Sequence, residues 1–233
     1  MSRETLKYSF IKSLPVMAGY IVLGTGFGVL LADKGYSFWW AILMSAVVYA
    51  GSLQYVGVTL LADGASPISA ALMSLMVNAR HLFYGISMLK KYREMDGRRF
   101  YTIFALTDET YSLVCKAEVP EGVEPHGYYF CLSLMNQSYW ILGSFLGAFL
   151  GNTLEFNWTG IDFSMTALFV VMFVEQWEKA ENHLPAVLGL AISVVCLLAF
   201  GEEYFLIPSM VFIALVLLLL KGPLEKKKGR NLL

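Results

Sequence analysis

The stretch "SLMVNARHLFYG", residues 74–85, places an Asn, an Arg and a His in the middle of an apolar run that covers residues 67–89. A run of about 20 apolar residues is long enough to cross the hydrocarbon core of a bilayer as a helix. A charged side chain at that depth costs several kcal/mol, so it is normally kept for a function or for a specific partner. The stretch therefore predicts a membrane helix whose polar face serves a function or binds a specific partner.

The rest of the chain has the same character. Its 233 residues are 57% hydrophobic and 15% aromatic, and the mean hydropathy is +0.60, well above that of an average soluble domain. Long apolar runs alternate with short polar breaks, which predicts an all-α polytopic membrane protein with about seven transmembrane helices. The expected spans are 12–32, 37–62, 66–89, 126–151, 162–178, 184–200 and 203–221.

Several features limit the possible functions. The first apolar run is too long for a signal peptide and lacks a small-residue cleavage site, so we expect it to be retained. The net charge of -1 says nothing about partners, and we expect no nucleic-acid partner. Cys115, Cys131 and Cys196 lie too far apart for a metal or redox motif. We therefore expect neither a metal nor a cofactor.

One segment does not fit a simple span. In "RRFYTIFALTDETYSLVCK", residues 98–116, four consecutive polar residues would point in every direction around one helical turn. No side of such a helix could face lipid. We expect this segment to be re-entrant or broken rather than to span the bilayer.

The basic residues suggest an orientation, because Lys and Arg collect on the cytoplasmic side of membrane proteins. Seven spans with an external N-terminus and residues 90–125 on the inside put thirteen of the 17 basic residues on one face, including segments 90–99 and 226–230. Only Arg3, Lys7 and Lys12 fall on the other face. A model with eight spans and an internal N-terminus places ten basic residues on one face and six on the other. The model with seven spans therefore fits the basic residues better.

The chain also contains a weak internal repeat. Residues 24–54 and 143–176 each read as a Gly-rich helix, a short loop and an apolar helix that carries a Gln. We expect a single transport domain over 1–233, with repeat halves 12–89 and 126–221 in opposite orientations, connected by 90–125. Backbone opened at Gly24 and Gly26 could bind an anionic group, although Gly-rich membrane helices are also common packing devices.

The polar residues of the opening stretch share one face. At 100° per residue, an arc of about 160° contains five polar residues together with Gly85: Ser74, Asn78, Arg80, His81 and Tyr84. Arg80 lies nine residues from the end of the run, which is about 14 Å along a helix and too deep for easy snorkelling. We expect it to meet Asp108 and Glu109 in a cavity near the midplane. A purely structural ion pair is the alternative.

These considerations give a set of candidate site residues. For substrate binding they are Gly24, Gly26, Gln54, Asn78, Arg80, Tyr84 and Asn136; for proton coupling they are His81, Asp108 and Glu109. An amide can bind backbone-like groups of a ligand, and histidine titrates near neutral pH. Helix packing is the alternative for Gln54, and an ordinary hydrogen bond between helices is the alternative for His81.

Taken together, four motifs resemble the AzlC family of branched-chain amino acid permeases over essentially the whole chain. They are "GSLQ" (51–54), "NARHLFYG" (78–85), "LTDETYS" (106–112) and "NQSYW" (136–140), which leads into "GSFLGAFLG". Ser52 stands where Ala is expected. The resemblance implies a protein of the bacterial cytoplasmic membrane that exports hydrophobic amino acids such as valine, leucine, isoleucine or methionine. It also implies a small AzlD-like membrane partner. The sequence contains no nucleotide-binding motif, so we expect a secondary transporter, and the candidate proton-coupling residues suggest proton antiport.

Two other classes remain as alternatives. An intramembrane enzyme would need a nucleophile with a base or a metal cluster, and the sequence contains neither G-x-S-x-G nor H-E-x-x-H. A scaffold or sensor subunit of a membrane complex would not transport at all.

Overall fold

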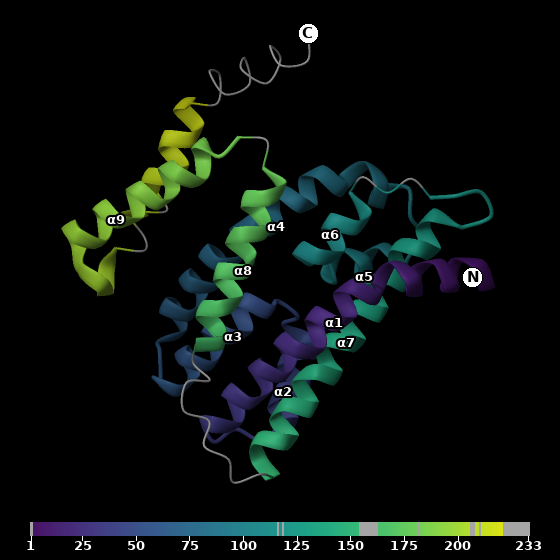
Figure 1. The fold of residues 1–233 in the computed structure, drawn as a ribbon, viewed down its shortest axis with the longest axis horizontal. Coiled ribbons are helices and arrows are strands. Elements are labelled where there is room, and N and C mark those ends of the chain that lie inside the picture. The colour runs from purple at the N-terminus through teal and green to yellow at the C-terminus, as the bar shows by residue number, and fades with distance from the viewer. Residues whose placement is uncertain are drawn as a thin grey trace. The chain divides into compact units, whose positions relative to one another are not determined.

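The structure is a computed structural model that describes residues 2–115, 117, 119–153, 163–180, 182–205, 208–209 and 211–220. Within these residues all regular elements are helices and there is no strand (Figure 1). The all-α prediction is therefore confirmed. The chain divides into two compact units, Met1–Phe169 and Val170–Leu233, and each is described by itself.

Two of the described helices are both long and apolar enough to cross a membrane: α1 (Arg3–Asp33) and the part of α9 over Leu184–Gly201. Shorter apolar helices cover Phe38–Val47, Gly51–Ala62 and Val211–Leu220. Helix α4 (Pro67–Arg93) has sufficient length, but its central Asn, Arg and His lower its hydropathy. The expected number of seven spans therefore stays a prediction for the chain as a whole.

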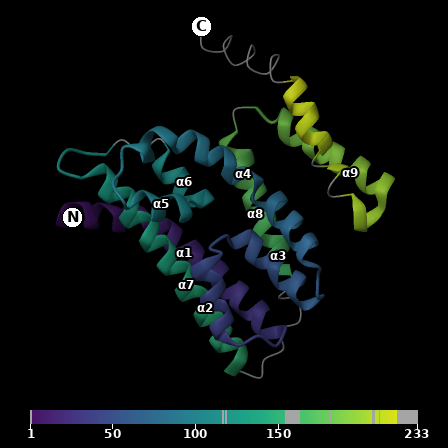
Figure 2. The ribbon, with the colours of Figure 1, turned by 180° about the vertical axis from the view of Figure 1, so that it is seen from behind.

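Helices α1 and α7 (Pro125–Thr153) lie side by side and run in the same direction (Figures 1 and 2). Thr5 lies beside Gly127 at one end, and Gly151 lies beside Ala32 at the other. The backbones approach so closely that a Cβ atom at Gly28 or at Gly147 would overlap the backbone of the opposite helix. Small residues allow this contact, as in other membrane helix pairs.

Two expectations about the Gly-rich helices are wrong. Helix α1 is continuous from Arg3 to Asp33, so its backbone does not open near Gly24 and Gly26. Gly24 packs against the α7 backbone instead. Because α1 and α7 are parallel, the repeat copies that begin at residues 24 and 143 do not have the opposite orientations that the sequence suggested.

Residues 37–62 form a helical hairpin, hairpin 1, rather than the expected single span. Helices α2 (Phe38–Val47) and α3 (Gly51–Ala62) are separated by a tip at 48–50. The Gln54 amide donates to the Ser45 hydroxyl (3.1 Å), and Gly57 lies beside Met44, so the two helices fold back on each other. Tyr49 has a φ of 40°, a left-handed conformation that interrupts the helix.

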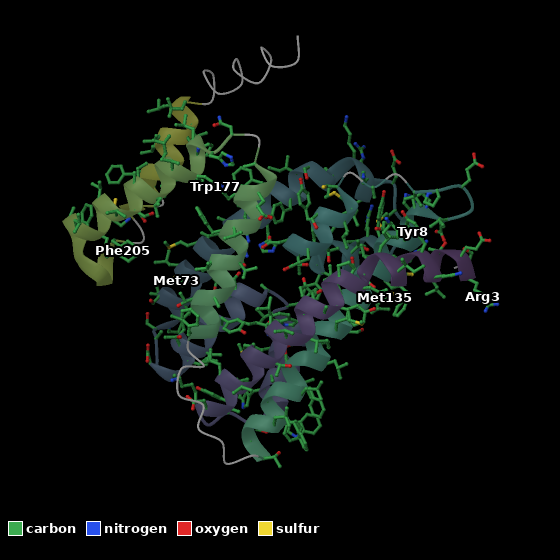
Figure 3. The ribbon with its side chains drawn as sticks, in the orientation of Figure 1. Arg3, Tyr8, Met73, Met135, Trp177 and Phe205 are labelled. Carbon is green, nitrogen blue, oxygen red and sulfur yellow. The ribbon has the colours of Figure 1, made fainter. Side chains whose placement is uncertain are left out.

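Helix α4 then runs back in the direction opposite to α1 and α7. It starts with Ser66, whose side chain accepts a hydrogen bond from the Ser69 amide, followed by Pro67 in the first turn. Its last turns pack in one apolar cluster with the first turns of α7, where Tyr92 and Met88 join Tyr128 and Leu132. Met73, labelled in Figure 3, lies in the first half of α4.

Helices α5 (Arg99–Phe104) and α6 (Asp108–Val114) form hairpin 2, which enters from the end where α4 stops. Arg98 pairs with Glu124 (2.8 Å) at the outer end, and Lys91 donates to the carbonyls of Val114 and Cys115. The tip lies at 105–107. The prediction that segment 98–116 is broken rather than one spanning helix is confirmed.

The tips of the two hairpins meet inside the first unit, having entered from opposite ends. The rings of Tyr49 and Phe104 lie 6.5 Å apart. Gln137 of α7 contacts both hairpins: its amide nitrogen donates to the Ala46 carbonyl (3.1 Å) and its oxygen accepts from the Tyr101 hydroxyl (2.6 Å). An inverted arrangement is therefore present, but it is formed by the two hairpins.

Among the described basic residues of the first unit that lie outside the helix centres, all but Lys34 gather at one end, the basic end. They are Arg3, Lys7, Lys12, Lys90, Lys91, Arg93, Arg98 and Arg99. The Glu124 amide donates to the Thr5 hydroxyl (3.1 Å), which places the N-terminal tail beside the 90–125 segment. The expected external N-terminus opposite this segment is thus wrong. Segment 226–230 lies outside the described residues.

The second unit contains the end of α8 (Phe163–Lys179) and all of α9 (Leu184–Tyr204). Trp177, labelled in Figure 3, stacks on His183 at a centroid distance of 4.2 Å. Gly201 has a φ of 73°, which interrupts the helix where the sequence predicted the break between two apolar runs. The helix Val211–Leu220 follows.

The hairpin topology predicts which positions share a side of the membrane. Lys34 precedes hairpin 1 and Asp63 follows it, so single cysteines there should both react with an impermeant maleimide from outside. Cysteines at Lys7 and Glu94 should react only from the cytoplasmic side, since basic segments stay inside. The measurement is labelling of intact cells and inverted vesicles, with the three native cysteines replaced by serine. Labelling of positions 34 and 63 from opposite sides would contradict the hairpin.

Candidate functional site

Arg80 connects the two hairpins. From the middle of α4 its Nη2 atom lies 3.0 Å from Oδ2 of Asp108 on α6 and donates to the Ser52 hydroxyl on α3 at 2.7 Å. The side chains of Arg80 and Asp108 are 31% and 20% exposed. The predicted meeting of Arg80 with the acidic segment is therefore present. Ser52, in the first turn of α3, was not among the predicted site residues.

Three polar atoms at this junction have unused hydrogen-bonding capacity. Arg80 Nε, Asp108 Oδ1 and Asn78 Oδ1 are buried and have no hydrogen-bond partner within the described part of the chain. A buried polar group without a partner costs about 1–3 kcal/mol. Such atoms mark the place where a ligand with its own donors and acceptors would gain most.

The neighbouring carboxylate, Glu109, points to a different helix. The Tyr20 hydroxyl of α1 donates to Glu109 Oε2 at 2.6 Å and lies 2.7 Å from the Thr107 hydroxyl. Consecutive residues thus tie the tip of hairpin 2 to α4 through Asp108 and to α1 through Glu109. Sequence reasoning missed Tyr20, because a single tyrosine in a long apolar helix gives no periodic signal.

Other predicted residues lie around hairpin 2. The Tyr84 ring stacks on Tyr111 with centroids 4.4 Å apart, and the His81 ring meets the edge of Tyr84 at 5.6 Å. His81 Nδ1 lies 3.3 Å from the Asn78 carbonyl. On α7, the buried Asn136 donates to the Thr110 hydroxyl at 3.0 Å.

Gln54 and Gly24 lie apart from this group. Gln54 is fully buried, accepts a hydrogen bond from Trp140 Nε1 (2.8 Å) and donates to Ser45. Gly24 faces the backbone of Trp140. Both residues hold hairpin 1 or α1 against α7, which is the packing role that the sequence left open. Their assignment to substrate binding stays a prediction without geometric support.

A cavity of about 750 Å³ lies between the two tips and α4. Its apolar wall comes mainly from α4 and hairpin 2: Leu82, Ile86, Leu89, Ile103, Phe104 and Leu106. Asn78 and His81 supply polar groups to the lining, and Ala50 at the tip of hairpin 1 also lines the cavity. Arg80, Tyr84, Asp108 and Glu109 do not line it. The volume lies within the range of about 300–1,000 Å³ that is typical of small-molecule sites.

The cavity extends along α4 from Asn78 to the basic end, where the exposed side chains of Arg93 and Arg99 line it. Fifteen residues of helix separate Asn78 from Arg93, or about 22 Å. Nearby, Arg98 is paired with Glu124 and with Asp96, and its hydrogen bonds hold the pKa of the Asp96 carboxyl below its usual value. Arg93 and Arg99 have no such acidic partner among the described residues.

No group of three or more His, Cys, Asp or Glu side chains within the described residues is arranged to hold a metal ion. The site offers hydrogen bonds, one ion pair and an apolar wall. This chemistry suits the binding of a small amphipathic molecule.

The chain is similar to membrane proteins of one family. The family model described as AzlC protein matches residues 15–154. The branched-chain amino acid transport protein AzlC of Bacillus subtilis is 42% identical over 218 residues, which cover 94% of this chain and 86% of that protein. An uncharacterized membrane protein of Haemophilus influenzae is 42% identical, over 96% of this chain and 92% of the relative. The inner membrane protein YgaZ of Escherichia coli is 26% identical over 73% of this chain and 72% of its own. No solved structure matches the chain.

The geometry predicts how the ion pair contributes to stability. Arg80→Gln or Asp108→Asn alone leaves a half-buried charge without its partner and should lower stability by about 1–3 kcal/mol. The double variant should regain most of that loss, because no charge is left unpaired. Thermal unfolding in detergent measures this, with a midpoint shift of about 2–4 °C per kcal/mol.

The exposed ion pair of Asp33 and Lys34, 3.6 Å apart, is the matched control. Neutralising either of its charges should change the stability little. Equal losses for both single variants and an additive loss for the double variant would mean that the two charges are not coupled.

Proposed function

This chain belongs to the AzlC family, and from that membership we propose that it transports hydrophobic amino acids, branched-chain ones above all, across the bacterial cytoplasmic membrane. One observation carries the proposal. The cavity between the hairpin tips combines an apolar wall with two polar groups near the tip of hairpin 1, Asn78 Oδ1 and the Tyr49 hydroxyl, which are buried and have no hydrogen-bond partner within the described residues. That combination is complementary to a zwitterion with an aliphatic side chain.

The polar end can accommodate both charges of the amino acid. The first turn of α3 has no side-chain cap at Ala50, so its amide N–H groups face the tip without an intrahelical partner. Arg80 adds positive charge to the same turn through Ser52. We place the substrate carboxylate there, as at other interrupted membrane helices. The acceptor oxygen of Asn78 then receives the ammonium group.

The apolar wall receives the side chain. Leu82, Ile86 and Leu89 of α4 face Ile103, Phe104 and Leu106 of hairpin 2 across the cavity. These residues offer no hydrogen bond to a side chain, so a polar substrate would leave its own groups unsatisfied. The site therefore favours valine, leucine, isoleucine and methionine over polar amino acids.

The arrangement favours loading from the cytoplasm. The cavity reaches Arg93 and Arg99 at the basic end, and we place this end on the cytoplasmic side because Lys and Arg collect there in membrane proteins. Exposed cations at the mouth attract the carboxylate of the substrate. Export is the direction in which such a conformation would collect its substrate.

For coupling, we propose proton antiport through His81, Asp108 or Glu109. His81 lines the cavity, so its ring can respond to the presence of substrate. Glu109 shares a short hydrogen bond with Tyr20 at the tip of hairpin 2, where a change of protonation would loosen the contact between that tip and α1. A change in the protonation of either residue would thus affect the helices around the cavity.

The transport proposal is tested with labelled valine in proteoliposomes, with and without a small AzlD-like partner. Arg80→Lys keeps the positive charge but loses the planar guanidinium, whose Nη2 contacts both Asp108 and Ser52 and whose Nε donor has no partner among the described residues and is free for a ligand. We expect valine flux to fall about tenfold or more at normal membrane abundance. The exposed control Lys34→Gln should transport normally. A scaffold or sensor would give no flux in any of these preparations, and unchanged flux in Arg80→Lys would limit Arg80 to a structural role.

Proton coupling is tested by imposing a pH gradient with the higher proton concentration on the side to which valine moves. We expect the gradient to accelerate flux in the wild type and to lose most of its effect in His81→Asn or in Glu109→Gln. Tyr20→Phe, which removes the hydroxyl next to Glu109, should weaken the response without abolishing valine exchange. Wild-type flux that ignores the gradient would exclude this coupling and leave the transport proposal intact.

A further inference from the structure

We propose that Gly85 determines the size of the side chain that the cavity accepts, so that it is a specificity-determining residue of this transporter. The proposal rests on the proposed function, because it assumes that the cavity between α4 and the hairpin tips holds the substrate side chain.

Gly85 occupies the middle of the cavity wall. The α4 residues that line the cavity are Asn78, His81, Leu82, Gly85, Ile86, Leu89, Tyr92 and Arg93. At 100° per residue they cover an arc of about 140°, and position 85 lies within about 30° of its centre. It also lies between the polar end at Asn78 and the basic mouth at Arg93. A side chain at position 85 would therefore project into the cavity beside the substrate.

The space in front of Gly85 is open. A Cβ atom built at this position finds no other heavy atom within 4 Å. The glycines at the α1 and α7 contact are different, because a Cβ at Gly28 or Gly147 would overlap backbone. Packing between helices, the usual reason for glycine in a membrane helix, therefore does not explain Gly85.

Glycine in a helix interior costs about 0.5–1 kcal/mol relative to alanine. No close contact at position 85 offsets that cost, and its φ is not in the left-handed region. What the missing side chain provides is free volume next to Ile86 and Leu89. This volume suits the branched end of a leucine or isoleucine side chain.

A graded series tests the inference. Gly85→Ala and Gly85→Val add one and three carbon atoms to this space, and the Cβ atom of either residue meets no other heavy atom within 4 Å. The assay is labelled valine exchange in proteoliposomes, with unlabelled alanine, valine, leucine and phenylalanine as competitors. One methylene group in an apolar pocket is worth about 10–200-fold in discrimination. In Gly85→Val we expect the potency of leucine as a competitor to fall at least about tenfold relative to that of alanine. Gly85→Ala should show a smaller shift in the same direction.

Gly19 provides the matched control. It lies in the continuous helix α1, it is exposed, and its Cβ would also meet nothing within 4 Å, but it does not line the cavity. Gly19→Ala and Gly19→Val gain the same helix propensity and should keep the wild-type order of competitors.

The outcomes are distinguishable. Absence of valine exchange in the wild type would overturn the proposed function and this inference with it. Wild-type exchange with an unchanged order of competitors in both Gly85 variants would overturn the inference alone, as would a uniform loss for all amino acids. Loss of the folded protein in Gly85→Ala, seen as a lower unfolding temperature in detergent than for Gly19→Ala, would show that the position is packed and would also overturn it.

Discussion

The structure of the first unit depends on hydrogen-bond partners for the backbone amide and carbonyl groups at the ends of interrupted helices. Away from water, a free carbonyl or amide group is costly, and each hairpin creates two such ends at its tip. Gln137 supplies one solution: its amide donates to the carbonyls of Ser45 and Ala46 near the end of α2, while its oxygen accepts from Tyr101 of α5. A single side chain on α7 thus holds both hairpins at the depth where their tips meet.

A rigid frame makes this arrangement possible. The glycines of α1 and α7 bring the two backbones into contact along the second halves of both helices, so neither helix can rotate there without a clash. The N-terminal turn adds a polar contact at the basic end, where Thr5 accepts from the Glu124 amide. Hairpin 1 and hairpin 2 are then held against a fixed support from opposite ends, and α4 closes the space between them. The cavity is what remains where the tips do not fill that space.

Arg80 is at the centre of this geometry because it contacts both hairpins at once. Its contacts with Ser52 and Asp108 join elements that enter from opposite ends of the unit, and Tyr20 secures the same tip through Glu109. A motion that separates the two hairpins must break these polar contacts. The charges that we propose to bind substrate therefore lie next to the charges that hold the tips together, which would be a physical basis for coupling substrate binding to opening.

The sequence by itself determined the membrane character, the helical class, the break within 98–116 and the meeting of Arg80 with the acidic segment, because these depend on composition and on the cost of burying polar groups. It also carried the family resemblance. Only the tertiary structure decided that residues 37–62 turn back on themselves, that α1 and α7 are parallel, and that Gln54 packs while Asn78 and His81 line the cavity. An apolar segment satisfies hydropathy equally well as a span or as a hairpin. The choice comes from the left-handed conformation at Tyr49 and from the contacts of Gln54 and Gln137, which join residues far apart in the chain.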